Sequence, residues 1–203
     1  MSGLYIVQVA ICICFMDGFD GQPLYEDKCH VDEMDRRFNG AYNREVVLQR
    51  QIGSLKNQLD SFRETIERLQ FHLGCLNENG TYLEDNVTKS RYCFIKAPFN
   101  WKNAKGKCQS FGSHLLEINT ESEQKWLRDK VSSSEGMWWI GLVLHTVEHL
   151  WIWDHSESAS TLKNWHPAEP NGEGLEKCAL VKKDGRWRDY PCTSKFYFIC
   201  ERK

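Results

Sequence analysis

The sequence predicts an α+β domain that follows a long α-helical segment. Three observations support this fold class: a heptad pattern of apolar residues within positions 29–74, two helix patterns after position 99, and short tryptophan-rich strand patterns beyond them. The 203 residues are 41% hydrophobic and carry a net charge of -2. This length and composition can support one well-packed domain plus an appendage.

The chain opens with an apolar run over residues 4–16 that is typical of a signal-peptide core. The run is too short to cross a bilayer, which takes about 20 residues. We therefore predict a signal peptide over residues 1–20, no membrane span, and a secreted, extracellular protein. A retained anchor or a buried strand is the alternative. Cys12 and Cys14 would be removed with the signal peptide.

Residues 29–74 are predicted to form a coiled-coil oligomerisation neck. Apolar residues recur there at alternating steps of three and four, which is a heptad seam about 39 Å long. A seam of two residues per heptad is narrower than the apolar face of a helix packed on its own domain, which is the alternative. We expect a homo-oligomer, and both a dimer and a trimer remain open. The seam has Ile52, Leu59, Ile66 and Leu73 at position a, and Leu48, Leu55, Phe62 and Leu69 at position d.

A polar stretch over residues 75–92 follows the neck and is predicted to be an exposed connector or hairpin. It contains two N-glycosylation sequons, at Asn79 and Asn86. Either asparagine is a candidate to carry a glycan.

Residues 93–203 contain the helix and strand patterns of the predicted domain. Asn100–Phe111 is predicted to be a helix that buries Trp101, and a capping box at residues 120–123 opens a second helix through Lys130. Residues 137–144 and 150–153 are rich in Trp, Ile, Leu and Val and are predicted to be buried strands. We expect five tryptophans in the core: Trp101, Trp139, Trp151, Trp153 and Trp187.

The segment from Asn164 to Cys192 gathers acidic and amide side chains that are suited to calcium. Calcium takes six to eight oxygen ligands from carboxylates, amide oxygens, backbone carbonyls and water. Zinc is the poorer interpretation, since the segment offers neither free thiols nor a histidine pair. The candidate ligands are Glu169, Asn171, Glu176 and Asp189.

Several motifs in one order resemble the carbohydrate-recognition domain of C-type lectins. They are Trp139-Ile140-Gly141-Leu142, Glu169-Pro170-Asn171, Glu176 before Cys178, Trp187 and Asp189 before Cys192, and Phe198-Ile199-Cys200. The resemblance implies a C-type lectin-like fold over residues 93–203, one calcium ion per domain and no catalytic activity. A lectin domain behind a coiled coil is similar in layout to the collectins.

The resemblance also implies how sugar would bind. The four calcium ligands would hold the ion and contact two neighbouring sugar hydroxyls, and the bond before Pro170 would be cis. The order Glu169-Pro170-Asn171 resembles members that select equatorial 3- and 4-hydroxyls, as in mannose, N-acetylglucosamine, glucose and fucose. Multivalent recognition of microbial or cell-surface glycans in innate immunity would be the role.

Nine cysteines leave seven after the signal peptide, and pairing is the default in an oxidising compartment. The resemblance implies three disulfides, and it leaves Cys29 available for an interchain bridge. The implied pairs are Cys108–Cys200, Cys178–Cys192 and Cys75–Cys93.

The chain departs from the family pattern at Arg188, where an asparagine would be expected. A guanidinium offers no oxygen to a metal, so Arg188 removes one ligand, although it could reach a sugar or an acidic glycan. The family's auxiliary calcium site also looks mostly lost. Glu148 matches one of its ligands, but Leu144, Gly172 and Lys177 stand where acids would be expected.

Other functional classes find little support. His145, Glu148 and His149 fit a zinc-protease pattern, but that chemistry needs a helix where the sequence favours strands. Lys and Arg are interspersed with Asp and Glu, so no basic cluster indicates nucleic-acid binding. The main alternative is a calcium-independent protein-binding module on the same fold.

Overall fold

The computed structural model describes residues 27–85 and 88–203, with the side chains of the first helix described from Asp35 onward. The predicted signal peptide and Asn86 lie outside the described residues, as does the side chain of Cys29. The chain divides into two compact units, one up to Lys56 and one from Asn57 to Lys203. No described helix is long and apolar enough to cross a membrane.

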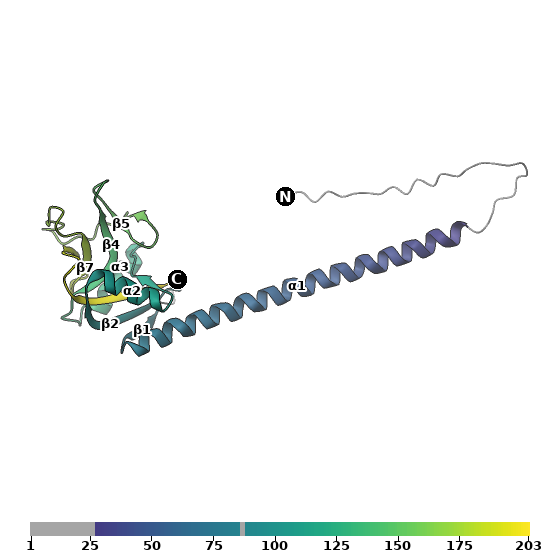
Figure 1. Ribbon diagram of the computed structural model, residues 1–203, viewed down its shortest axis with the longest axis horizontal. Helices are drawn as coiled ribbons and strands as arrows, with labels where there is room; N and C mark the ends of the chain where they lie inside the picture. The colour runs from purple at the N-terminus through teal and green to yellow at the C-terminus, as the bar shows by residue number, and fades with distance from the viewer. Residues whose placement is uncertain (1–26, 86–87) are drawn as a thin grey trace, which may run out of the picture. The chain divides into compact units, whose positions relative to one another are not determined.

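Helix α1 spans Asp27–Asn77 and contains the whole predicted neck (Figure 1). The seam residues are at least half exposed in both units, from 50% for Leu69 to 68% for Leu59. A stripe of large apolar side chains left in water at this spacing indicates an interaction face, which agrees with the predicted coiled coil.

The second unit holds a mixed α+β fold built on one sheet of nine described strands. Its main path runs β1-β2-β9-β4-β5-β6, with β3 paired to β9 and with β7 joining β4 to β8. The pairing of β4 with β9 is parallel, and the other described pairings are antiparallel. The strands are β1 Thr81–Glu84, β2 Arg91–Phe99, β3 His114–Leu115, β4 Trp138–His145, β5 Leu150–Trp153, β6 Ser158–Ala159, β7 Cys178–Val181, β8 Trp187–Tyr190 and β9 Phe196–Arg202.

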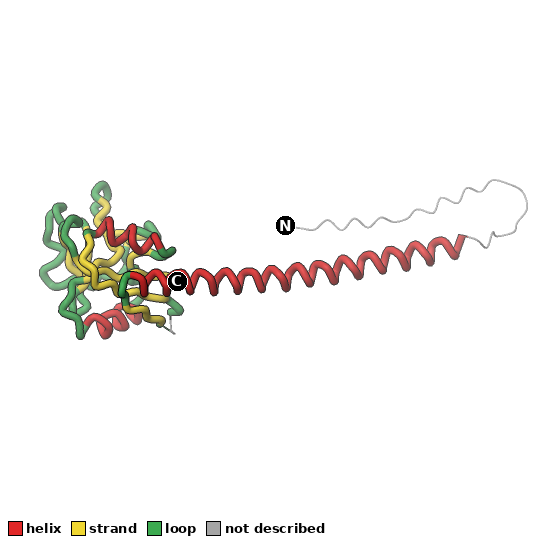
Figure 2. The backbone as a smooth tube through the Cα atoms, turned by 60° about the horizontal axis from the view of Figure 1, so that its bottom comes forward, coloured by secondary structure: helices red, strands yellow, loops and turns green. Residues whose placement is uncertain are grey.

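Two short helices lie on opposite sides of the strands (Figure 2). Helix α2 spans Trp101–Ser110, and the side chain of Asn100 caps it by accepting from the backbone N–H of Asn103 at 2.8 Å. Helix α3 spans Glu121–Val131 and is capped by Thr120, whose Oγ1 accepts from the backbone N–H of Glu123 at 3.1 Å. Both helices fall within a residue or so of their predicted ends.

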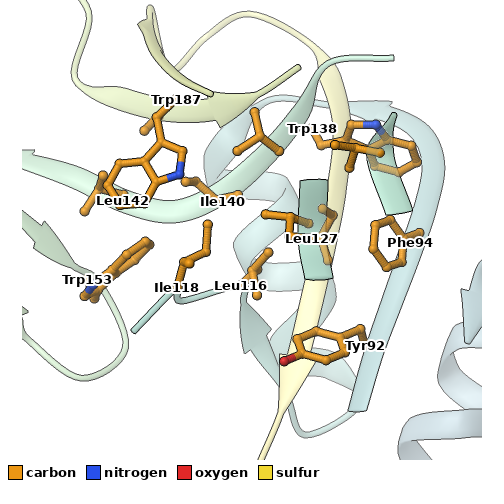
Figure 3. Close-up of a cluster of buried hydrophobic side chains, with 14 residues drawn as sticks. Tyr92, Phe94, Leu116, Ile118, Leu127, Trp138, Ile140, Leu142, Trp153 and Trp187 are labelled. Carbon is orange, nitrogen blue, oxygen red and sulfur yellow. The ribbon is translucent and has the colours of Figure 1, made fainter. Parts of the chain in front are cut away.

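Two clusters of buried side chains form the core of this unit. The first packs α3 against β4, β5 and β8, and Figure 3 shows Trp153 and Trp187 beside Ile118 and Leu142. The second packs α2 against β9 around Trp101. The predicted core tryptophans are buried except Trp151, which is only partly covered. These clusters include Trp187 of β8 and Leu180 of β7, so the packing of the core fixes the position of the β7–β8 hairpin.

Three disulfides link the elements of this unit, in the pairs that the family resemblance implied. Cys75–Cys93 joins α1 to β2, Cys108–Cys200 joins α2 to β9, and Cys178–Cys192 closes the β7–β8 hairpin. Each such bond typically stabilises a fold by about 2 to 4 kcal/mol. The third one joins the end of the loop that carries Glu169, Asn171 and Glu176 to the end of the strand that carries Asp189.

Candidate functional site

The candidate site is built from strand β8 and the long loop that precedes β7. Side chains alternate along β8, so Trp187 and Asp189 point inward and are buried while Arg188 is half-buried on the other face. The loop is attached to β8 at Trp187, whose backbone N–H donates to Asn164 O at 2.9 Å and whose carbonyl accepts from His166 N at 2.9 Å. These bonds hold the following residues against Asp189.

The buried carboxylate of Asp189 holds the tip of this loop. Its Oδ1 accepts from the backbone N–H of Asn171 at 3.1 Å, and its Oδ2 accepts from that of Gly172 at 3.0 Å. Two charge-assisted bonds to backbone donors fix the loop relative to β8. The loop's Glu169–Pro170 peptide bond is cis.

Glu176 packs closely against Gly172, and so lies beside the tip of the loop that Asp189 holds. A Cβ added to Gly172 would lie only 2.3 Å from Glu176 Cβ and 2.9 Å from its Oε2, so only glycine leaves room there. Asn171 uses its amide Nδ2 to donate to Ala168 O at 3.1 Å, which leaves the amide oxygen as an acceptor for another partner.

The carboxylates of the loop and of Asp189 interact unfavourably with one another. Burial, the adjacent carboxyl of Asp189 and the charge of Glu176 raise the pKa of Glu169 to about 7. Burial and the charge of Asp189 also raise the pKa of Glu176. In addition, Oε2 of Glu169 is buried and has no hydrogen-bond partner among the described residues. The site therefore has excess negative charge and an unused oxygen, and both would be satisfied by a cation.

The carboxylates alone do not make a complete metal-binding set. Among the described residues, no group of three or more His, Cys, Asp or Glu side chains is arranged to hold a metal ion. An ion at this loop would therefore also need oxygens from the Asn171 amide, the backbone and water, which are ordinary calcium ligands.

Arg188 is paired with Asp184 in the β7–β8 turn. Its Nη1 lies 3.0 Å from Asp184 Oδ1 and its Nη2 lies 2.6 Å from Oδ2, which is a bidentate ion pair. This guanidinium lowers the pKa of Asp184 to about 2. Its charge also reaches Glu169, where it opposes the rise in pKa. Arg188 is thus a fixed positive charge near the carboxylates.

The other predicted features lie apart from this loop. Segment 145–149 forms the end of β4 and a turn, so the helix that the zinc-protease pattern requires is absent from this described segment. Glu148, the residual auxiliary ligand, faces His145 Nδ1 at 3.8 Å. Asn79 is exposed in the turn after α1, where a glycan could be attached.

A group of buried carboxylates at the far end of β9 has no signal in the sequence. Glu201 is fully buried, and burial together with the charge of Glu123 raises its pKa to about 8. Glu117 accepts from the backbone N–H groups of His155 and Ser156 at 3.0 and 2.9 Å. The sequence does not distinguish these acids from exposed ones, because the residues that bury them lie far away in the sequence.

Comparison with known proteins places this geometry in a family. The family model of the Lectin C-type domain matches residues 97–202, just over half of the chain. Hepatic lectin of Gallus gallus is 28% identical over 159 residues, which cover 77% of this chain and 74% of that protein. CD209 antigen-like protein A of Mus musculus is 36% identical over 115 residues, which cover 56% of this chain and 48% of that protein.

A solved structure gives the same result. The carbohydrate-recognition domain of the mouse scavenger receptor C-type lectin superposes with a TM-score of 0.54 at 32% identity, over 59% of this chain and 92% of that one. The alignments thus span most of the hepatic lectin but about half of the CD209-like protein.

Proposed function

Because the chain belongs to the C-type lectin domain family, whose members are non-enzymatic binding proteins, we propose that it is a calcium-dependent carbohydrate-binding protein. Its ligands would be glycans with equatorial 3- and 4-hydroxyls, and its lectin domain would span residues 93–203. Glycan binding follows from the family, whereas the calcium requirement and the sugar preference are the proposal.

The unpartnered carboxylate oxygen of Glu169 carries this proposal. It is buried beside Asp189 and Glu176, where burial and these two carboxylates raise the pKa of Glu169. Leaving a buried acceptor unsatisfied costs about 1 to 3 kcal/mol, and placing like charges together adds to that cost. A protein retains such an arrangement more readily when a cation compensates it.

The same side chains would contact both the ion and the sugar. Glu169, Asn171, Glu176 and Asp189 would hold one calcium ion per domain. When bound, calcium would neutralise the carboxylates and offer free coordination positions to two neighbouring sugar hydroxyls. Each hydroxyl would also donate to a carboxylate oxygen and accept from an amide N–H, so the same side chains would fix the sugar's orientation.

The order Glu169-Pro170-Asn171 supports a preference for mannose, N-acetylglucosamine, glucose or fucose over galactose. Arg188 supports a weaker calcium affinity than a family member with asparagine there, because its charge lies near the ion. The loss of acids at Leu144, Gly172 and Lys177 supports one calcium ion rather than several.

The remaining assignments complete the proposal. Residues 1–20 would be a signal peptide, residues 29–74 an oligomerisation neck with Cys29 as an interchain link, and residues 75–92 a connector glycosylated at Asn79 and Asn86. A secreted oligomer of this kind would suit multivalent recognition of microbial or cell-surface glycans in innate immunity.

A second candidate function, calcium-independent binding of a protein ligand, is favoured by the Arg188–Asp184 ion pair. This pair turns a family ligand position into a structural link within the β7–β8 hairpin. The two functions differ in what a chelator does to the melting temperature. A calcium-dependent lectin should melt at a lower temperature in chelator, whereas the protein-binding module should be unaffected.

The direct test compares two single-charge variants from one loop. Glu169→Gln removes the carboxylate that carries the proposal, while Glu173→Gln removes an exposed acid that is not among the candidate ligands. In calcium, the first variant should lose binding to immobilised mannan and the second should bind like the wild type. Equal binding by both variants would refute the assigned role of Glu169.

A further inference from the structure

A small polar pocket lies between α3 and the turn that joins β7 to β8. The two elements share a buried cluster, which contains Leu127 of α3 and Trp187 of β8 (Figure 3). The turn comes so close to the helix that a Cβ added to Gly185 would lie 2.6 Å from Cγ of Arg128. The pocket has a volume of about 160 Å³, and its lining residues do not include the candidate calcium ligands. It is therefore distinct from the calcium site.

Two amide side chains line this pocket and hold its parts together. Gln124 is buried, and its Nε2 donates to Gly185 O at 2.9 Å while its Oε1 accepts from Trp187 Nε1 at 2.8 Å. Asn164 Nδ2 donates to the same Gly185 carbonyl at 2.8 Å. Each amide nitrogen carries a second N–H that these bonds do not use. The pocket therefore contains two fixed hydrogen-bond donors.

Three cations surround these amides without matching carboxylates. Lys125, Arg128 and Arg186 all line the pocket. Among the residues that the structure describes, neither Lys125 nor Arg186 has a carboxylate partner. Arg128 reaches only its exposed neighbour Asp129, at 4.0 Å. Exposed pairs of this kind contribute little, so the positive charge of all three side chains remains largely uncompensated.

The acids that line the pocket do not offset this charge. Asp184 is already engaged by Arg188 in the bidentate ion pair, at 3.0 and 2.6 Å. Glu121 is the other lining acid and is exposed. Three uncompensated cations thus face one uncompensated carboxylate. Like charges held close together repel one another, and an anion between them would remove that cost.

The size and the donors of the pocket select the kind of anion. Its volume equals that of about five water molecules, which suits a tetrahedral oxyanion and is too small for a drug-sized ligand. Guanidinium groups donate in planar forks that match phosphate and carboxylate oxygens. A phosphate or sulfate ester presents three acceptor oxygens where a carboxylate presents two. With two guanidinium groups, an ammonium group and two amides available, the ester is the better match.

We propose that this pocket binds a sulfate or phosphate ester group carried by the glycan. Arg186 precedes Asp189 by three residues, which is about 10 Å of extended chain. The ligands would therefore be glycans whose ester lies about that far from the sugar held at the calcium site, on a neighbouring sugar. Only the carrier rests on the proposed function, because the anion site needs neither calcium nor sugar.

Titration with inorganic sulfate in chelator tests the anion site. Arg128→Gln with Arg186→Gln removes two cations and keeps the Cβ and Cγ of residue 128 that cover Gly185. Lys96→Gln with Lys102→Gln is the matched control, since it removes two exposed cations elsewhere. By calorimetry at low ionic strength, with chloride as the reference anion, the wild type and the control should bind one sulfate per chain.

The arginine variant should bind sulfate at least about tenfold more weakly, because each guanidinium contributes charge-assisted hydrogen bonds. Equal binding by all three proteins, or no binding by the wild type, would overturn the anion site.

Columns of mannan and of chemically sulfated mannan, both run in calcium, test the carrier. The wild type and the lysine control should be retained longer on the sulfated column, and the arginine variant should lose that gain. Equal retention of the wild type on both columns would overturn the ester and leave a site for a free anion. Sulfate binding by a protein that ignores both columns would refute the lectin function and the carrier, whereas retention on mannan without sulfate binding would refute the anion site alone.

Discussion

Replacing Gly172 by alanine tests whether Glu176 is a calcium ligand without altering any charge. The new Cβ would lie 2.3 Å from Glu176 Cβ and 2.4 Å from its Cγ. Ordinary contact begins near 3.4 Å, so the Glu176 side chain must move by about 1 Å. Metal ligands tolerate displacements of about 0.2 Å. We therefore expect calcium affinity to fall at least about tenfold, equivalent to about 1.4 kcal/mol.

Isothermal titration of the full chain with calcium measures this loss. Gly174→Ala is the matched control in the same loop, because it has a positive φ of 86° but no described atom within 4 Å of the added Cβ. It should cost stability through backbone strain, by about 1 kcal/mol, and bind calcium close to wild-type strength. If Gly172→Ala binds calcium as tightly as the wild type, Glu176 is not a ligand.

Three further predictions follow from the structure. Arg188→Asn should raise calcium affinity about fivefold, since removing a nearby charge is worth on the order of 1 kcal/mol; calorimetry showing no gain would place the arginine outside the site. Glu169→Gln combined with Asn171→Asp should move retention from mannan to galactan columns, and unchanged preference would reject this loop as the selector. Glu201→Gln should gain stability over the wild type as pH rises from 4.5 to 8, because the native carboxyl keeps its proton up to about pH 8 and the unfolded one loses it near 4.5. Melting curves in which the difference between the two proteins stays constant with pH would contradict the last prediction.

The sequence predicted the elements whose signals are local. Heptad spacing predicted α1, capping residues predicted α2 and α3 to within a residue or so, and apolar runs predicted β4 and β5. The C-type lectin-like fold and its family followed from motif order and are shown by the comparisons. These features depend on neighbours in sequence, where propensity and periodicity act directly.

Other features depend on contacts between distant positions, and the sequence did not reveal them. The burial of Glu201 needs β9 to pair with β3, which lies far away in the sequence, although its position is that of an ordinary charged residue near the end of a strand. The burial of Phe71 on α1 is likewise set by β1 and α2, which come later in the chain.

Retention of the full chain on immobilised mannan, measured in calcium and again after chelation, tests the central claim most directly. A galactan column controls for nonspecific adsorption. We predict retention on mannan in calcium, release by chelator, recovery when calcium is restored, and weak retention on galactan. Retention that survives chelation, or its absence in calcium from a correctly folded protein, would contradict calcium-dependent sugar binding at Glu169, Asn171, Glu176 and Asp189.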